Sequence, residues 1–235
     1  MAKEITRTIT VPIDTMNPTS GDKAGYQNRK LTFDENTLRD DNGRAIMMEW
    51  EKPLMEAQAK TICQKGGKIL NVGFGMGYID DAIQTHDIEH HTIIECHPDV
   101  WQKMRDDGWM DKPNVECLFG TWQEVMPKLE KDGRMFEGVY FDTWDENDIA
   151  FHLNIQRLIL PGGIYSWFNK THDPENVQMH ERYIPLLKWF DIECEKLKCV
   201  PPTEEEQNDG KGDGWYWNPN SSIYWNPVAV RKLWT

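Results

Sequence analysis

Short apolar runs alternate with segments of helical spacing from about residue 66 to residue 190. The apolar runs predict strands and the segments between them predict helices. The predicted strands are Lys68–Val72, Thr92–Cys96, Asn114–Leu118, Gly138–Phe141, Gly163–Trp167 (after a turn at Pro161-Gly162-Gly163), Asp191–Cys199 and Ile223–Arg231. The predicted helices are Met76–Thr85, Pro98–Asp107, Trp122–Leu129, Asp145–Ile159 and Val177–Trp189. This alternation predicts an α/β fold, a doubly wound and mainly parallel seven-stranded sheet covered on both faces.

The N-terminal part of the chain has a weaker pattern. Residues 1–43 are polar, and we interpret them as an irregular arm. Ala45–Cys63 carries apolar residues at roughly helical spacing, which predicts a helix that Pro53 breaks or begins. We therefore divide the chain into an N-terminal arm or lid, residues 1–44, and a single domain, residues 45–235.

Composition excludes several classes of protein. The 235 residues include 26 basic and 39 acidic side chains, a net charge of −13, and they form no basic patch of the kind that binds nucleic acid. No apolar run is long enough to span a membrane, and we expect no signal peptide because the first residues lack its apolar run. Five scattered cysteines without a CxxC pair are typical of reduced thiols, so we expect a cytoplasmic protein.

A glycine-rich motif carries the clearest chemistry. In KILNVGFGMGYIDDAI, Gly73, Gly75 and Gly77 follow a predicted strand and precede a predicted helix, as in sheets that bind nucleotide-like ligands. The next strand ends in Glu95, an acidic residue placed for ribose hydroxyls. Tyr78 stands where a dinucleotide motif has a small residue. The motif therefore predicts an adenosine cofactor. The last two predicted strands, Asp191–Cys199 and Ile223–Arg231, favour a methyltransferase sheet over a dinucleotide-binding sheet.

Histidines gather around the second predicted strand but do not indicate a metal site. His86, His90, His91 and His97 match no standard ligand spacing. Asp142, in contrast, falls at the carboxyl end of the fourth predicted strand, beside the topological switch point where ligands of open sheets bind. We therefore expect no metal and a functional carboxylate at Asp142.

Six blocks in order resemble guanidinoacetate N-methyltransferase and its relative, the fungal arginine δ-N-methyltransferase. The blocks are MEWEKPLM (Met48–Met55), GGKILNVGFGM (Gly66–Met76), TIIECHPDVWQKMRD (Thr92–Asp106), GTWQEV (Gly120–Val125), FEGVYFDTW (Phe136–Trp144) and LPGGIYSWFN (Leu160–Asn169). The resemblance extends over about Ala45–Asn169, more than half of the chain. The resemblance implies a Rossmann-like class I methyltransferase that uses S-adenosyl-L-methionine and releases S-adenosyl-L-homocysteine.

The resemblance also implies a set of residues around the cofactor. They are Gly73, Phe74, Gly75, Met76, Gly77 and Tyr78 at the methionine part, Glu95 at the ribose, Cys96, His97, Thr121 and Trp122 at the adenine, and Met47, Met55 and Asp142 around the molecule. The chain departs from the family at Asn71, where an acidic residue is usual. Tyr26 or Phe33 would form the aromatic lid of the family.

For the substrate, the resemblance implies that Glu51 and Asp142 grip a guanidinium group and that Asn169 and Thr171 bind a carboxylate. Carboxylates suit a guanidinium because its paired N–H groups donate to them in a charge-assisted fork. Asp142 is the candidate general base, with Glu51 as second anchor.

We therefore predict an S-adenosylmethionine-dependent N-methyltransferase acting on a small guanidino compound such as guanidinoacetate, arginine or a similar acid. Its partners would be that small molecule, without nucleic acid or membrane. Two alternatives stay open. The acceptor would be a small amine, a hydroxyl or a protein arginine, or the chain would be a non-catalytic cofactor-binding regulatory module.

Overall fold

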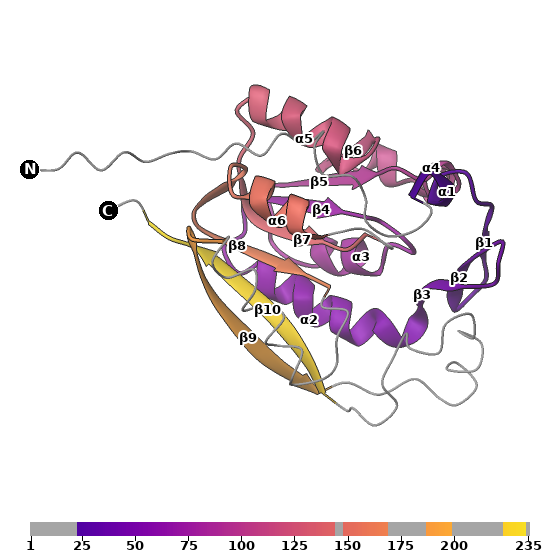
Figure 1. The fold of residues 1–235 in the computed structure, drawn as a ribbon, viewed down its shortest axis with the longest axis horizontal. Helices are drawn as coiled ribbons and strands as arrows, with labels where there is room; N and C mark the ends of the chain where they lie inside the picture. The colour runs from indigo at the N-terminus through magenta and orange to yellow at the C-terminus, as the bar shows by residue number, and fades with distance from the viewer. Residues whose placement is uncertain (1–22, 144–147, 169–186, 199–222, 234–235) are drawn as a thin grey trace, which may run out of the picture.

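A computed structural model describes residues 23–143, 148–168, 187–198 and 223–233 (Figure 1). The helical elements are α1 (Lys23–Tyr26), the 3₁₀ helix η2 (Glu49–Glu51), α2 (Lys52–Ile62), α3 (Tyr78–Gln84), α4 (Pro98–Asp106), η3 (Trp109–Asp111), α5 (Trp122–Lys131) and α6 (Asp148–Ile155). The strands are β1 (Leu31–Phe33), β2 (Thr37–Asp40), β3 (Ala45–Met48), β4 (Lys68–Val72), β5 (His90–Glu95), β6 (Val115–Phe119), β7 (Phe136–Phe141), β8 (Ile159–Trp167), β9 (Phe190–Lys198) and β10 (Ile223–Arg231).

The large sheet has the strand order β6-β5-β4-β7-β8-β10-β9. Strands β4 to β8 pair in parallel, and β10 pairs antiparallel with both β8 and β9. The predicted doubly wound, mainly parallel seven-stranded sheet is therefore confirmed. From β4 the chain builds outward through β5 and β6, then crosses to β7 on the other side, so the switch point lies between β4 and β7.

Alternation along the central strands fills a core on each face of the sheet. In β4, Ile69 packs against residues of α2, α3 and α4, while Leu70 and Val72 pack against residues of α5 and α6. Successive side chains of a strand point to opposite faces, so a continuous apolar run serves both layers. Gly138 of β7 lets α2 approach closely, because a Cβ there would overlap the backbone oxygen of Ile62.

The N-terminal region differs from its prediction. Its described part is not irregular but forms a three-stranded antiparallel sheet, β1-β2-β3. Ala45–Met48 is a strand rather than the start of a helix, because β2 offers it a partner. Helix α2 begins at Lys52, with Pro53 in its first turn, where a missing N–H costs nothing.

Other boundaries also shifted. The predicted turn at Pro161-Gly162-Gly163 lies inside β8, where the register against β7 shifts between Phe136 and Gly138. Helix α6 ends at Ile155, four residues before the predicted end at Ile159. Most of the predicted helix Val177–Trp189 falls outside the described residues, and residues 187–189 lead into β9 without forming a helix. Within the described ranges, no helix has the length and apolar character needed to cross a membrane.

Candidate functional site

The glycine motif forms a tight turn at the carboxyl end of β4. Gly73 and Gly75 have φ angles of 96° and 57°, a region that side-chain-bearing residues rarely adopt. A Cβ on Gly73 would overlap the carbonyl oxygen of Asp142, and a Cβ on Gly75 would lie 3.0 Å from the sulfur of Met47. The turn therefore needs glycine for its backbone conformation and for the closeness of its neighbours.

Backbone hydrogen bonds join the ends of neighbouring strands at this edge. The amide of Asp142 donates to the carbonyl of Val72 at 3.0 Å, and the amide of Gly73 donates to Ile94 at 2.9 Å. On the other side, the amide of Gly120 donates to the carbonyl of Glu95 at 2.9 Å. The ends of β4, β5, β6 and β7 are thereby held as one continuous rim.

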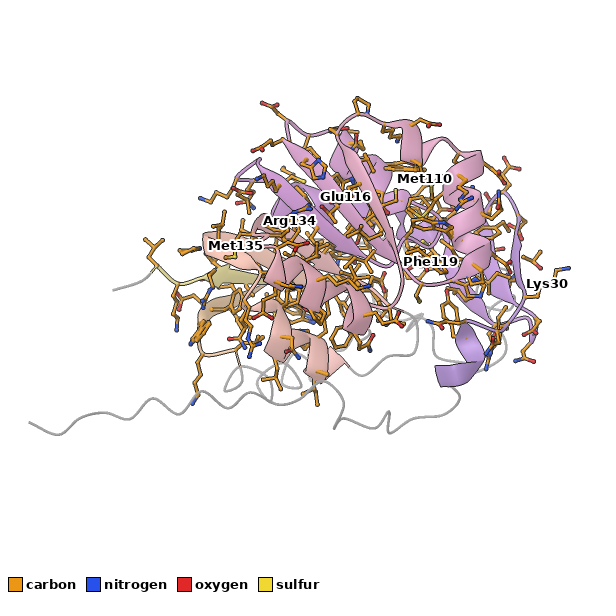
Figure 2. All side chains as sticks on the ribbon, turned by 90° about the horizontal axis from the view of Figure 1, so that it is seen from above. Lys30, Met110, Glu116, Phe119, Arg134 and Met135 are labelled. Atoms are coloured by element: carbon orange, nitrogen blue, oxygen red, sulfur yellow. The ribbon has the colours of Figure 1, made fainter. Side chains whose placement is uncertain are left out.

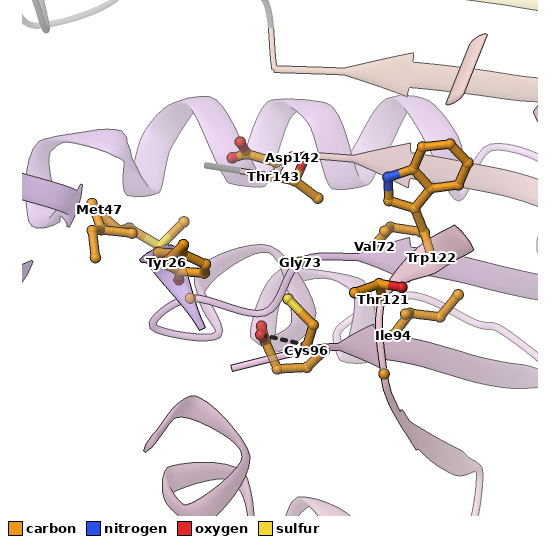
Figure 3. Close-up of a pocket in the computed structure, with 14 residues that line it drawn as sticks. Tyr26, Met47, Val72, Gly73, Ile94, Cys96, Thr121, Trp122, Asp142 and Thr143 are labelled. Atoms are coloured by element: carbon orange, nitrogen blue, oxygen red, sulfur yellow. Dashed lines mark hydrogen bonds between the residues drawn. The ribbon is translucent and has the colours of Figure 1, made fainter. Parts of the chain in front are cut away.

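A pocket opens on this rim (Figure 3). In the close-up, Tyr26 and Met47 lie at one end, Thr121 and Trp122 at the other, and Asp142 with Thr143 on the far side of Gly73 from Cys96. The residues that line it are Tyr26, Ile46, Met47, Val72, Gly73, Gly75, Ile94, Glu95, Cys96, Gly120, Thr121, Trp122, Asp142 and Thr143. Eight of the residues predicted for the site are thus brought together by strand ends and by β3.

Glu95 is the buried carboxylate of the pocket. Its Oε2 accepts the amide of Phe74 at 2.9 Å, and its Oε1 accepts the amides of Cys96 and His97 at 2.7 Å each. Burial raises the pKa of Glu95, and these backbone hydrogen bonds oppose the rise because they favour the charged form. A carboxylate held by three amides has a fixed orientation toward the glycine turn.

The N-terminal segment supplies one wall of the pocket. The sulfur of Met47, on β3, accepts the amide of Met76 at 3.3 Å, which places β3 directly over the glycine turn. Tyr26 ends α1 and lines the pocket, whereas Phe33, the other predicted lid residue, packs against the core. Burial raises the pKa of Tyr26, and the charges of Glu95, Cys96 and Asp142 add to the rise.

The two predicted catalytic carboxylates, Glu51 and Asp142, lie near one buried tyrosine. Burial raises the pKa of Tyr140 well above its usual value, and the nearby charges of Asp142 and Glu51 both contribute. Asp142 lines the pocket, whereas Glu51 is only 2% exposed and accepts the amide of Met48 at 2.8 Å. Both carboxylates therefore belong to the same region, with Asp142 alone of the two in the pocket wall.

Four further predicted residues support the turn or the core instead of lining the pocket. Phe74 is buried edge-on against Trp109, with ring centroids 5.3 Å apart. Tyr78 donates to the sulfur of Met76 at 3.3 Å. Met55 is fully buried, 3.6 Å from the Tyr140 hydroxyl. Gly77 precedes α3 in a left-handed conformation.

The remaining predicted residues lie elsewhere. His97 is fully buried at the start of α4, and its ring nitrogens bond away from the pocket. Asn169 and Thr171 lie outside the described residues. Asn71, where the chain departs from the family pattern, donates to the carbonyl of Gly73 at 2.9 Å and to Asp80 at 2.8 Å, so its amide supports the glycine turn.

Sequence reasoning missed five lining residues: Ile46, Val72, Ile94, Gly120 and Thr143. Val72 and Ile94 are the last apolar residues before Gly73 and Glu95, so their position in the strands was a usable signal. Ile46 could not be found in this way, because its segment was predicted as a helix and so offered no strand end at which to expect a lining residue. Among the described residues, no group of three or more His, Cys, Asp or Glu side chains is arranged to hold a metal ion.

A family model described as guanidinoacetate N-methyltransferase matches residues 19–198, most of the chain. The chain belongs to the guanidinoacetate N-methyltransferase family. Relatives named protein arginine N-methyltransferase 2 support this membership. The one from Yarrowia lipolytica is 39% identical over 218 residues, which cover 88% of this chain and 46% of the relative. The one from Saccharomyces cerevisiae is 37% identical over 191 residues, which cover 77% of this chain and 46% of that relative.

The chain spans about half the length of these curated relatives. Solved structures with the same fold are more distant in sequence. Spermidine synthase from Thermotoga maritima has a TM-score of 0.59 at 14% identity, covering 88% of this chain and 74% of that one. Precorrin-6y C5,15-methyltransferase from Geobacter metallireducens has a TM-score of 0.54 at 11% identity, covering 78% and 89%. These likenesses confirm the Rossmann-like class I methyltransferase fold for this member of the family.

Proposed function

We propose that this chain is an S-adenosylmethionine-dependent N-methyltransferase whose acceptor is the guanidinium group of a small guanidino compound. The observation that carries the proposal is the position of Asp142. Asp142 lines the same pocket as the glycine turn and Glu95. The residues proposed to bind the cofactor and the carboxylate proposed to accept the cationic group therefore belong to one pocket.

The residues of the pocket suit S-adenosylmethionine. Gly73 and Gly75 line the pocket and present the backbone of the glycine turn to a ligand, and Glu95 offers carboxylate oxygens to ribose hydroxyls. Val72, Ile94 and the largely buried Trp122 provide apolar walls for an adenine ring. When bound, the cofactor supplies an electrophilic methyl group on a sulfonium.

The carboxylates suit a guanidinium acceptor. Asp142 would accept a guanidinium N–H and so orient one nitrogen, with Glu51 as the second anchor. The nitrogen loses a proton as it gains the methyl group, because its lone pair is delocalised while it stays protonated. Asp142 is the group in the pocket wall that would take this proton.

A second candidate acceptor is an arginine within a protein. It is favoured by the names of the relatives, which are called protein arginine N-methyltransferase 2. The small acceptor is favoured by the wall that Tyr26, Ile46 and Met47 add to one end of the pocket. Such a wall narrows the access that an arginine on a folded surface requires.

The test is mass spectrometry of reactions with S-adenosylmethionine and a panel of acceptors. The panel contains guanidinoacetate, free arginine, a simple amine and a short peptide with one internal arginine. We expect a product with one added CH₂ unit on guanidinoacetate or free arginine and none on the amine. Methylation of the peptide alone would replace the small acceptor by a protein arginine.

Asp142→Asn is the matched variant for this assay, because it keeps the size of the side chain and removes its basicity. Glu137→Gln is the control on the same strand. Glu137 lies at the start of β7 and accepts the amide of Lys68 at 2.6 Å, away from the pocket. Binding of S-adenosylhomocysteine without turnover on any acceptor would instead support a regulatory cofactor-binding module.

A further inference from the structure

Two hydrogen bonds tie the N-terminal segment to the start of α4. The carbonyl of Arg29 accepts from Nε2 of His97 at 3.0 Å, and the amide of Leu31 donates to Oδ2 of Asp99 at 2.8 Å. Each bond joins residues 68 positions apart in the sequence. In Figure 2, Lys30, between these two anchor points, lies at the end of the molecule nearer Phe119 of β6 and away from Met135.

His97 is committed to this role through both ring nitrogens. The amide of Asp99 donates to Nδ1 at 3.1 Å, so Nδ1 is an acceptor and caps α4. Nε2 then carries the proton in the neutral ring and donates to Arg29. The ring is fully buried, and its centroid lies 4.9 Å from that of Tyr26 at 60°.

Tyr26 connects the ring of His97 to the pocket, because it contacts that ring and also lines the pocket. It lines the pocket, and the charges of Glu95 and Asp142 are close enough to contribute to the rise of its pKa. The adjacent backbone at Arg29 and Leu31 is the part of the segment that His97 and Asp99 hold. A substitution at His97 would therefore change the position of Tyr26 in the pocket wall, without any contact between His97 and a ligand.

We propose that His97 and Asp99 are positioning residues that hold Tyr26 in the pocket wall and thereby raise the affinity of the site for its cofactor. The identity of that cofactor rests on the proposed function. Holding the segment removes the freedom that it would otherwise lose when the ligand binds, which is how preorganisation strengthens binding.

His97→Asn separates the two roles of His97. Asparagine is a favoured N-cap residue, so its side-chain oxygen can replace Nδ1 as acceptor for the amide of Asp99. Its side chain is too short to donate to Arg29 and has no ring to pack on Tyr26. The control is Gln102→Ala, on the same helix, which removes only an exposed hydrogen bond to Asp106.

The first experiment is hydrogen exchange of the unliganded full chain. We expect His97→Asn and Asp99→Ala to increase exchange about tenfold or more at the amide of Leu31, while the amides of β4 stay protected as in the unsubstituted protein. Gln102→Ala should leave the exchange at Leu31 unchanged. Unchanged exchange at Leu31 in both His97→Asn and Asp99→Ala would overturn the proposal.

The second experiment is calorimetric binding of S-adenosylhomocysteine to His97→Asn, Tyr26→Ala and the double variant. We expect His97→Asn to weaken binding about five- to tenfold, the effect of a lost hydrogen bond and ring contact. If His97 acts through Tyr26, the double variant binds no more weakly than Tyr26→Ala alone. Additive losses would overturn the proposal. Absence of binding by the unsubstituted protein would instead overturn the proposed function, and hydrogen exchange would still decide the role of His97 and Asp99.

Discussion

The α-carbon of Gly73 faces the carbonyl oxygen of Asp142 so closely that a Cβ on Gly73 would overlap it. The end of β4, which begins the glycine turn, is therefore in direct contact with the end of β7, which carries the candidate general base. The amide of Asp142 also donates to Val72, the residue before Gly73, at 3.0 Å. The position of the carboxylate and the shape of the turn depend on each other.

We expect Gly73→Ala to lower the free energy of unfolding by more than about 3 kcal/mol and to abolish S-adenosylhomocysteine binding, because the strained φ and the overlap act together. Gly133→Ala is the control. Gly133 also has a positive φ, 68°, but nothing lies within 4 Å of its added Cβ, so only the backbone cost of about 1–2 kcal/mol remains. Chemical denaturation and calorimetry measure both, and equal losses in the two variants would contradict the contact.

We expect Glu95→Gln to weaken S-adenosylhomocysteine binding about 10- to 100-fold, since hydrogen bonds to a charged group contribute about 1.5–3 kcal/mol. Glu116→Gln is the control. Glu116 lies on β6, forms an ion pair with Arg134 at 2.8 Å and does not line the pocket. Calorimetry compares the two variants. An affinity of Glu95→Gln equal to that of Glu116→Gln would remove Glu95 from the cofactor site.

We expect Asp142→Asn to lower kcat at least about 100-fold, the size of a lost general base, while S-adenosylhomocysteine affinity changes less than about tenfold. The reason for this split is that asparagine preserves the shape and the backbone contacts at Gly73 but cannot take up a proton. Turnover on guanidinoacetate or arginine and calorimetry of the same preparations provide the two measurements. Turnover near that of Glu137→Gln would exclude Asp142 as the base.

The stability of the protein should depend on pH through His97. Burial lowers the pKa of His97, and the Asp99 carboxylate opposes this in part. The unfolded histidine, with a pKa of about 6.5, therefore binds a proton before the folded one does. The stabilising contribution of neutral His97 is fully present above that pKa and decreases as the pH falls toward the folded pKa.

We expect the stability difference between the unsubstituted protein and His97→Asn to shrink as the pH is lowered from 7.5 through about 6.5. Denaturation curves at several pH values measure the difference directly. The comparison cancels the other groups whose pKa is shifted, including Glu95 and Tyr26, as far as the substitution leaves them unchanged. A difference that is constant over this range would show that His97 does not titrate as the structure implies.

Much of the fold followed from the sequence because its signals are local. Lys68–Val72 and Ile223–Arg231 are strands with the predicted bounds, since their apolar runs fit a sheet buried on both sides or a paired hairpin. Ala45–Met48 could not be predicted in this way. Its apolar spacing fits a helix, and only the pairing of Leu38 with Met47 across β2 and β3 decides for a strand.

The candidate site was also predicted in part from local sequence and decided in part by tertiary contacts. The sequence by itself determined the chemistry of the rim, because Gly73, Glu95 and Asp142 stand at strand ends, and parallel strands bring their carboxyl ends to one edge. Only the tertiary structure decided which side chains face the pocket. Tyr26 lines it, while His97 turns away to hold Arg29, because these contacts join segments about 70 residues apart and have no local signal in the chain.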